Sequence, residues 1–121
     1  MDIHSFTSDL STKQSNTILL LHEMVMENSG LEIKKRWKLP FYYRRSWICY
    51  FNILKNGDVE WAFVRGNELS NELGWLLDRG RKQIYSVSFS GPEDVDMTKA
   101  NIYLQEALLL DEHVKYTVRK S

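Results

Sequence analysis

Few residues of the chain could perform chemistry, and none completes a known catalytic pattern. His22-Glu23 begins as a zinc-protease helix would, but position 26 is methionine, so the second imidazole is missing. Cys49, the single cysteine, lies in the apolar stretch 47–51, which favours core packing over a nucleophilic role. Gly-x-Ser-x-Gly, P-loop and Gly-x-Gly-x-x-Gly patterns are absent from the sequence. We therefore expect no catalytic residue and no cofactor.

Acidic residues gather in two places, and hard divalent cations prefer their oxygen ligands. One place holds Glu93, Asp94 and Asp96, and the other is Asp111-Glu112-His113. They support an alternative function, the handling of iron or another divalent metal. Acids near helix ends are more often solvated or serve as capping groups.

Aromatic residues and cations gather in the middle of the chain with no catalytic constellation beside them. Arg79-Gly80-Arg81-Lys82 is the nearest approach to an anion site, because a glycine admits a phosphate to the backbone while cationic side chains hold it. The alternative for this segment is a solvated loop. The leading hypothesis is a non-enzymatic ligand-binding or interaction module that takes a small or anionic molecule on an aromatic sheet face. An enzyme of unrecognised type is the third alternative. The candidate ligand-binding residues are Trp37, Tyr42, Tyr50, Trp61, Arg65, Gly66, Arg81 and Lys82.

The aromatic residues could have either of two roles, in the core or in a groove. They are too many to be exposed singly, so some must pack between sheet and helices, which is their more ordinary role, and others could line a groove. The six basic residues from Lys34 to Arg45 could bind single-stranded nucleic acid together with Trp37, Tyr42 and Tyr43. However, the 16 Lys and Arg residues are balanced by 16 Asp and Glu residues. Lys34, Arg36 and Lys38 also alternate along the chain, as expected for the solvent-exposed face of one strand. We expect no nucleic-acid partner.

The length of 121 residues indicates one domain, 1–121, because domains commonly span ~100–150 residues. The predicted domain has a loose N-terminus, 1–9, and a polar C-terminal tail, 111–121. No apolar run approaches the ~20 residues that cross a bilayer, and the N-terminus does not resemble a secretory signal. One cysteine is compatible with a reducing compartment, so we expect a cytoplasmic protein.

The hydrophobic pattern predicts a helix, about five strands and a second helix. Strands that run between two amphipathic helices favour an α+β fold with an antiparallel sheet. In the strand from 59 to 64, Val59, Trp61 and Phe63 share one face. Asn56-Gly57 predicts a type I′ hairpin turn, and Ser90 with Glu93 predicts a capping box. The expected helices are 10–28 and about 96–111, and the expected strands are 32–38, 41–43, 47–54, 59–64 and 83–89, with a further short strand at 114–118.

Three segments in this order are similar to a known family. The segment 38–42 follows a Trp-bearing strand, the segment 49–52 precedes a hairpin and then 62–69, and Gly80-Arg81-Lys82 leads to a strand and to 90–96. Together they resemble the YdhG-like domains, a bacterial family largely of unknown function, over about 10–110. The resemblance implies an antiparallel sheet flanked by terminal helices, and some relatives are discussed as frataxin-like iron chaperones.

The chain also departs from that family. Trp61 stands where relatives often carry a smaller, glycine-containing step, and a bulky side chain there could fill a groove that other members leave open. The segment 73–75 lacks the usual turn proline. Exposed strand edges such as Pro40–Tyr43 could pair in a homodimer, although proline also protects edges.

Overall fold

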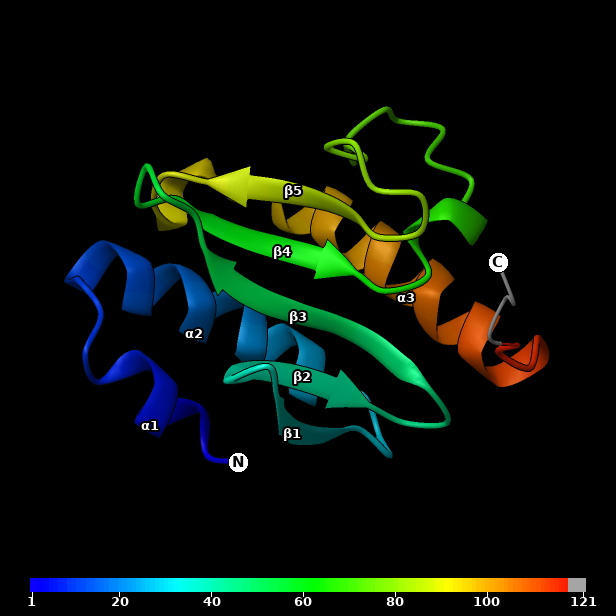
Figure 1. Ribbon diagram of the computed structural model, residues 1–121, viewed down its shortest axis with the longest axis horizontal. Helices are drawn as coiled ribbons and strands as arrows, with labels where there is room; N and C mark the ends of the chain where they lie inside the picture. The colour runs from blue at the N-terminus through cyan, green and yellow to red at the C-terminus, as the bar shows by residue number, and fades with distance from the viewer. Residues whose placement is uncertain (118–121) are drawn as a thin grey trace.

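A computed structural model describes residues 1–117 and places one antiparallel sheet against two long helices (Figure 1). The five strands lie side by side in chain order, so every neighbouring pair is joined by a short connection except the last. The α+β fold predicted from the sequence, with an N-terminal and a C-terminal helix flanking the sheet, is confirmed. The elements are α1 (Ile3–Thr7), α2 (Thr12–Met26), β1 (Glu32–Arg36), β2 (Leu39–Tyr43), β3 (Trp47–Ile53), β4 (Val59–Phe63), β5 (Tyr85–Phe89), α3 (Met97–His113) and the single-turn 3₁₀ segments η1 (Gly66–Glu68) and η2 (Pro92–Asp94).

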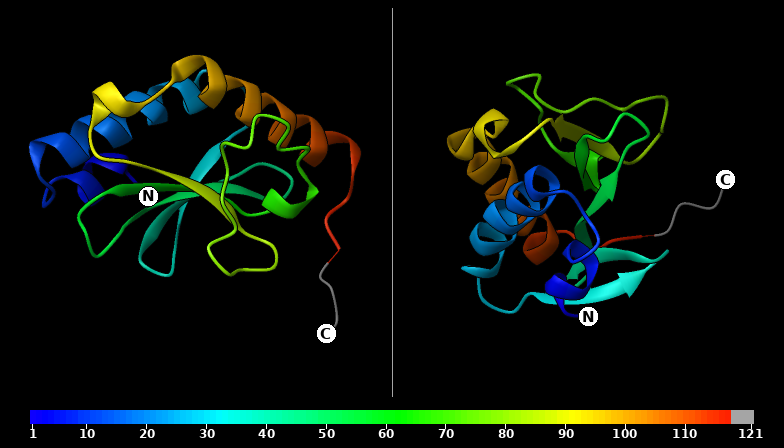
Figure 2. Two further views of the ribbon diagram at one scale, coloured as in Figure 1. Left: turned by 90° about the horizontal axis from the view of Figure 1, so that it is seen from above. Right: turned by 90° about the vertical axis from the view of Figure 1, so that its left-hand side faces the viewer.

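Both long helices cover the same face of the sheet, as the view from above shows (Figure 2). Ser11 begins α2 with a capping box, in which its side chain and that of Gln14 each accept the other's backbone N–H. Asp96 begins α3 by accepting the N–H of Lys99. The helices bury one stripe each, and the sheet buries the alternating residues that face them.

The main core fills the space between the sheet and the helices. Val59, Trp61 and Phe63 share the helix-facing side of β4, as their alternation predicts, and all three are buried. The Trp61 ring lies 4.6 Å from the Phe63 ring and 6.4 Å from the Trp75 ring. Full burial of each large apolar side chain contributes about 1.5–3 kcal/mol, so this cluster carries much of the stability.

The hairpin turn with two consecutive positive φ angles lies at a different place from the one that the sequence predicts. The Asn56-Gly57 hairpin is present, but only Gly57 has a positive φ, of 90°, so the turn is not the expected type I′. Trp37 and Lys38, predicted as strand, instead form the two-residue turn between β1 and β2, with φ of 54° and 63°. Positive φ is costly for side chains with a Cβ, and this turn keeps it without glycine.

Several predicted boundaries differ in the structure. Within the predicted loose N-terminus, Ile3–Thr7 form α1, and Ile3 is buried. The predicted tail begins too early, because α3 continues to His113, and residues 114–117 form no strand. The rest of that tail, including Val118 of the predicted strand, lies outside the described residues. The Ser90 N–H donates to Asp94 rather than to Glu93, so the expected capping box is wrong in its partner.

The proposed sheet edge is also wrong. β2 lies between β1 and β3 and forms ladders with both, so Pro40–Tyr43 is not free to pair with a second chain. Pro40 is tolerated because it stands near the start of its strand.

His22 gives the fold a pH-dependent component of stability. Its Nδ1 lies 2.7 Å from the Tyr42 hydroxyl, and burial, followed by the nearby His4, lowers the pKa of His22 from its ordinary value of 6.5. Below that value the unfolded chain binds more protons than the folded one, so the free energy of unfolding decreases as the pH falls through 6.5 and levels off below the folded pKa. We expect urea denaturation to show a smaller decrease between about pH 7.5 and about pH 5 in His22→Gln than in the wild type. Identical pH dependence in both proteins would contradict this role.

Candidate functional site

The sheet face opposite α2 and α3, here called the open face, carries its own aromatic cluster. Phe41, Tyr50, Ala62 and Val64 are buried there although no helix covers them (Figure 2). The Phe41 and Tyr50 rings stack with their centroids 4.3 Å apart. Neighbouring side chains, among them Leu39, Trp47 and Ile84, pack against this cluster.

Trp37 projects from the hairpin at one edge of this cluster. It is 63% exposed, although its ring meets the edge of Phe41 at 5.5 Å. The unfavourable turn conformation at Trp37 and Lys38 fixes this large apolar side chain at the hairpin tip. Backbone strain of this kind tends to occur at functional sites, where the surrounding structure holds it in place.

Arg36 lies between the aromatic rings of this edge. The centre of its guanidinium group is 4.4 Å from the Trp37 ring, 4.9 Å from the Trp47 ring and 5.4 Å from the Phe41 ring. Within the described chain, the Arg36 side chain forms no hydrogen bond and no ion pair. A guanidinium group is always charged and carries five N–H donors, so these donors remain available to an anion or to water.

Two adjoining hollows, the first of them beside Arg36, share Trp47, and we call them together the Trp47 groove. The first has a volume of about 390 Å³ and the second about 570 Å³, both within the ~300–1,000 Å³ range of ligand pockets. Trp47 and Tyr116 border both hollows. The first is further lined by Arg36, Trp37 and Gln83, and the second by Tyr43, Arg45 and Lys115.

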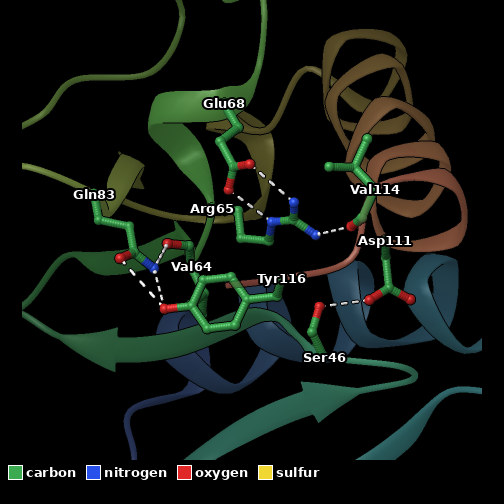
Figure 3. A network of polar contacts seen from close by, with 8 residues as sticks. All are labelled: Ser46, Val64, Arg65, Glu68, Gln83, Asp111, Val114 and Tyr116. Atoms are coloured by element: carbon green, nitrogen blue, oxygen red, sulfur yellow. Dashed lines mark hydrogen bonds and ion pairs between the residues drawn. The ribbon is translucent and has the colours of Figure 1, made fainter. Parts of the chain in front are cut away.

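The C-terminal segment 114–117 forms one wall of the groove and is fixed by Arg65 and Gln83 (Figure 3). Arg65 is buried, holds Glu68 through Nε at 2.7 Å and Nη2 at 2.9 Å, and donates from Nη1 to the Val114 carbonyl at 2.8 Å. The hydrogen bonds with Glu68 raise the pKa of Arg65 further, so it stays protonated. Gln83 Nε2 lies 3.2 Å from the Tyr116 hydroxyl and donates to the Val64 carbonyl at 3.0 Å.

Asp111 fastens the end of α3 to the β2–β3 connection beneath the second hollow. Its carboxylate is almost fully buried and accepts from the Arg44 side chain and the Arg45 backbone N–H. It also accepts from the Ser46 hydroxyl (Figure 3). Arg44 therefore neutralises Asp111, whereas the Arg45 side chain donates to the Glu112 main-chain carbonyl at 3.1 Å and keeps its charge unpaired. The groove consequently has more cationic than anionic character.

A buried carboxylate, Glu60, organises a second polar network on the open face. It is 2% exposed and accepts from Arg81 at 3.0 Å and from the Ser86 hydroxyl at 2.7 Å, with Arg79 at 3.9 Å. Burial, followed by the charge of Glu60, raises the pKa of Tyr50. The ion pair between Glu60 and Arg81 therefore holds the connection before β5 against the sheet.

Comparison of the chain with protein-family models, with curated proteins and with solved structures finds no match. The resemblance to YdhG-like domains, and the bacterial origin that it implies, thus stay predictions. The fold and site rest on the chain's own geometry.

The eight residues that the sequence predicts as one ligand site lie in different parts of the structure. Tyr42 and Trp61 lie in the helix-side core with no exposed surface, and Tyr50 is buried beneath its neighbours on the other face. Gly66 packs so closely that a Cβ there would come within 2.5 Å of the Tyr85 backbone nitrogen. Of the eight residues, Trp37 alone borders the Trp47 groove, while Arg65 supports its wall, Arg81 binds Glu60 and Lys82 is exposed on the connection before β5.

Sequence reasoning missed Arg36, Trp47, Gln83 and Tyr116 as groove residues. Arg36 and Trp47 are both near the basic and aromatic segment, but the prediction of an uninterrupted strand through 38 hid the hairpin that brings them together. Nothing in the sequence marks Gln83 and Tyr116 as partners, because they meet only through the path of the C-terminal segment.

Two of the acids predicted as metal ligands, Asp94 and Asp96, make other contacts. Asp94 accepts the Ser90 N–H, and Asp96 caps α3. Among residues 1–117, no three His, Cys, Asp or Glu side chains are grouped so that they could hold a metal ion. Burial raises the pKa of the Cys49 thiol to about 12, which keeps it protonated. No helix among those described is long and apolar enough to cross a membrane.

Proposed function

We propose that this protein is a binding module whose Trp47 groove takes an anionic ligand with a flat ring. The observation that carries the proposal is the Arg36 guanidinium group, which lies against three rings and has no partner among the described residues. A phosphate or carboxylate would satisfy its donors, and the exposed Trp37 ring beside it offers a stacking surface.

The charge around the groove supports this ligand class. Arg36, Arg45 and Lys115 border it without an ion pair inside the described chain, and Asp111 is neutralised by Arg44. Glu112 is the acid that also borders the second hollow. In a chain of zero formal net charge, this local excess of cations favours the approach of an anion.

The test is isothermal titration calorimetry with adenosine 5′-monophosphate, with adenosine and inorganic phosphate as separate probes. We expect the monophosphate to bind more tightly than either part, because it uses both the rings and the cation. Arg36→Gln should weaken its binding about tenfold, since a hydrogen bond to a charged group contributes ~1.5–3 kcal/mol. Lys13→Gln, the same loss of charge on the far side of the sheet in α2, should bind as the wild type does. Failure of all three probes to bind, or full binding by Arg36→Gln, would refute the proposal.

A further inference from the structure

The groove is larger than one ring and one phosphate require, and its two hollows share two chemical features. Each hollow has an aromatic wall and a cation without an ion pair among the described residues: Trp37 with Arg36 in the first, and Tyr43 with Arg45 in the second. The second hollow is also lined by Glu112 and by Asp111, which Arg44 neutralises. Trp47 stands between them and borders both. A ligand that fills the groove would therefore carry rings and negative charges in alternation.

The aromatic side chains form a continuous row along β2 and the beginning of β3. Ring centroids are separated by 5.5 Å from Trp37 to Phe41, 5.4 Å from Phe41 to Trp47 and 5.1 Å from Trp47 to Tyr43. All three contacts are edge-to-face, so neighbouring rings present surfaces in different directions. Phe41 is buried as the floor of the row, whereas Trp37, Trp47 and Tyr43 reach the surface.

Cations accompany this row throughout. Arg36 lies against Trp37 and Trp47, and Lys34 lies 4.2 Å from the centre of the Tyr43 ring. The ion pair of Lys34 with Glu32 is long, at 3.9 Å, and exposed, so it neutralises little of that charge. The balanced composition that argues against a nucleic-acid partner is an average over the chain, and it conceals this cluster.

We infer that the Trp47 groove accommodates two or more consecutive nucleotides of a single-stranded nucleic acid. Bases stack on Trp37 and against Trp47 and Tyr43, and Arg36 and Arg45 contact the phosphates. A single strand offers flat rings and anionic groups in alternation, which matches the two hollows better than an acidic peptide, whose charges come without rings. The inference rests on the proposed function and specifies its ligand.

Fluorescence anisotropy with a labelled ten-nucleotide strand of mixed sequence, as DNA and as RNA, tests the inference. We expect either strand to bind at least about tenfold more tightly than adenosine 5′-monophosphate, because it fills both hollows. Two phosphate contacts predict about a sevenfold loss of affinity when the salt concentration rises fourfold. Trp37→Ala, at an exposed turn, should weaken binding about tenfold, and Arg45→Gln about fivefold, whereas Lys13→Gln should have no effect.

Three results would overturn the inference while leaving the proposed function intact: the strand binds no more tightly than the monophosphate, poly-glutamate binds as tightly as the strand, or a duplex of the same sequence binds as tightly. If the monophosphate does not bind either, the proposed function fails as well. Circular dichroism of each variant separates loss of binding from loss of folding.

Discussion

Trp61→Ala should lower the free energy of unfolding by about 4 kcal/mol, the largest effect we expect from a single substitution in this chain. The side chain has no exposed surface, and its ring lies near those of Phe51, Phe63 and Trp75. Alanine would remove this packing and leave a cavity between β4 and the helices, which the surrounding rings can fill only in part. Urea denaturation followed by circular dichroism measures the change.

Two further variants separate the core role of Trp61 from a role in ligand binding. Trp61→Phe keeps most of the volume and should cost less than half as much as alanine. Trp37→Ala makes the same chemical change at a side chain that is 63% exposed, and it should change stability by no more than about 0.5 kcal/mol. A cost below about 1 kcal/mol for Trp61→Ala would show that Trp61 is not part of the packed core.

This contrast shows which part of the structure the sequence could predict. Alternation along β4 places Val59, Trp61 and Phe63 on one face, because side chains in a strand alternate with a period of two. The same rule, with the helical stripes at either end, was enough to predict the α+β sheet. It does not predict which face the helices cover, so the aromatic residues could not be divided between a core and a groove.

The candidate site depends on contacts that no local pattern contains. Trp37 and Lys38 form a two-residue turn although neither residue favours positive φ, so propensity predicts a strand there. Arg36 and Trp47 meet only after β1, β2 and β3 have paired, and Tyr116 meets Gln83 across 33 residues of sequence. Residue types with suitable chemistry were visible in the sequence, but their assembly required the sheet register and the path of the C-terminal segment.

The burial of Glu60 likewise depends on a long-range contact that no local pattern contains. Its substitution is expected to cause the second large loss of stability. The alternation along β4 places Glu60 on the face opposite Trp61, which no helix covers, yet it is 2% exposed. It is buried because the connection before β5 folds back and brings Arg81, 21 residues away, onto the open face. A buried carboxylate is costly unless paired and hydrogen-bonded, and here the guanidinium group and the Ser86 hydroxyl meet that need.

We expect Glu60→Leu to lower the free energy of unfolding by about 3 kcal/mol, because it leaves the buried Ser86 hydroxyl without its acceptor and Arg81 without its close anionic partner. Arg81 would keep only neutral acceptors, the Asp78 carbonyl and the Ser86 hydroxyl oxygen. Arg81→Leu should cost a similar amount, since the Ser86 hydroxyl would still donate to Glu60 but the more distant Arg79 would be its only cationic partner among the described residues. The double variant should be distinctly more stable than the sum of the two losses predicts, because it removes both charges and replaces them with apolar side chains. Urea denaturation of all four proteins gives the coupling free energy. Additive losses would mean that the 3.0 Å contact between Glu60 and Arg81 does not hold the connection to the sheet.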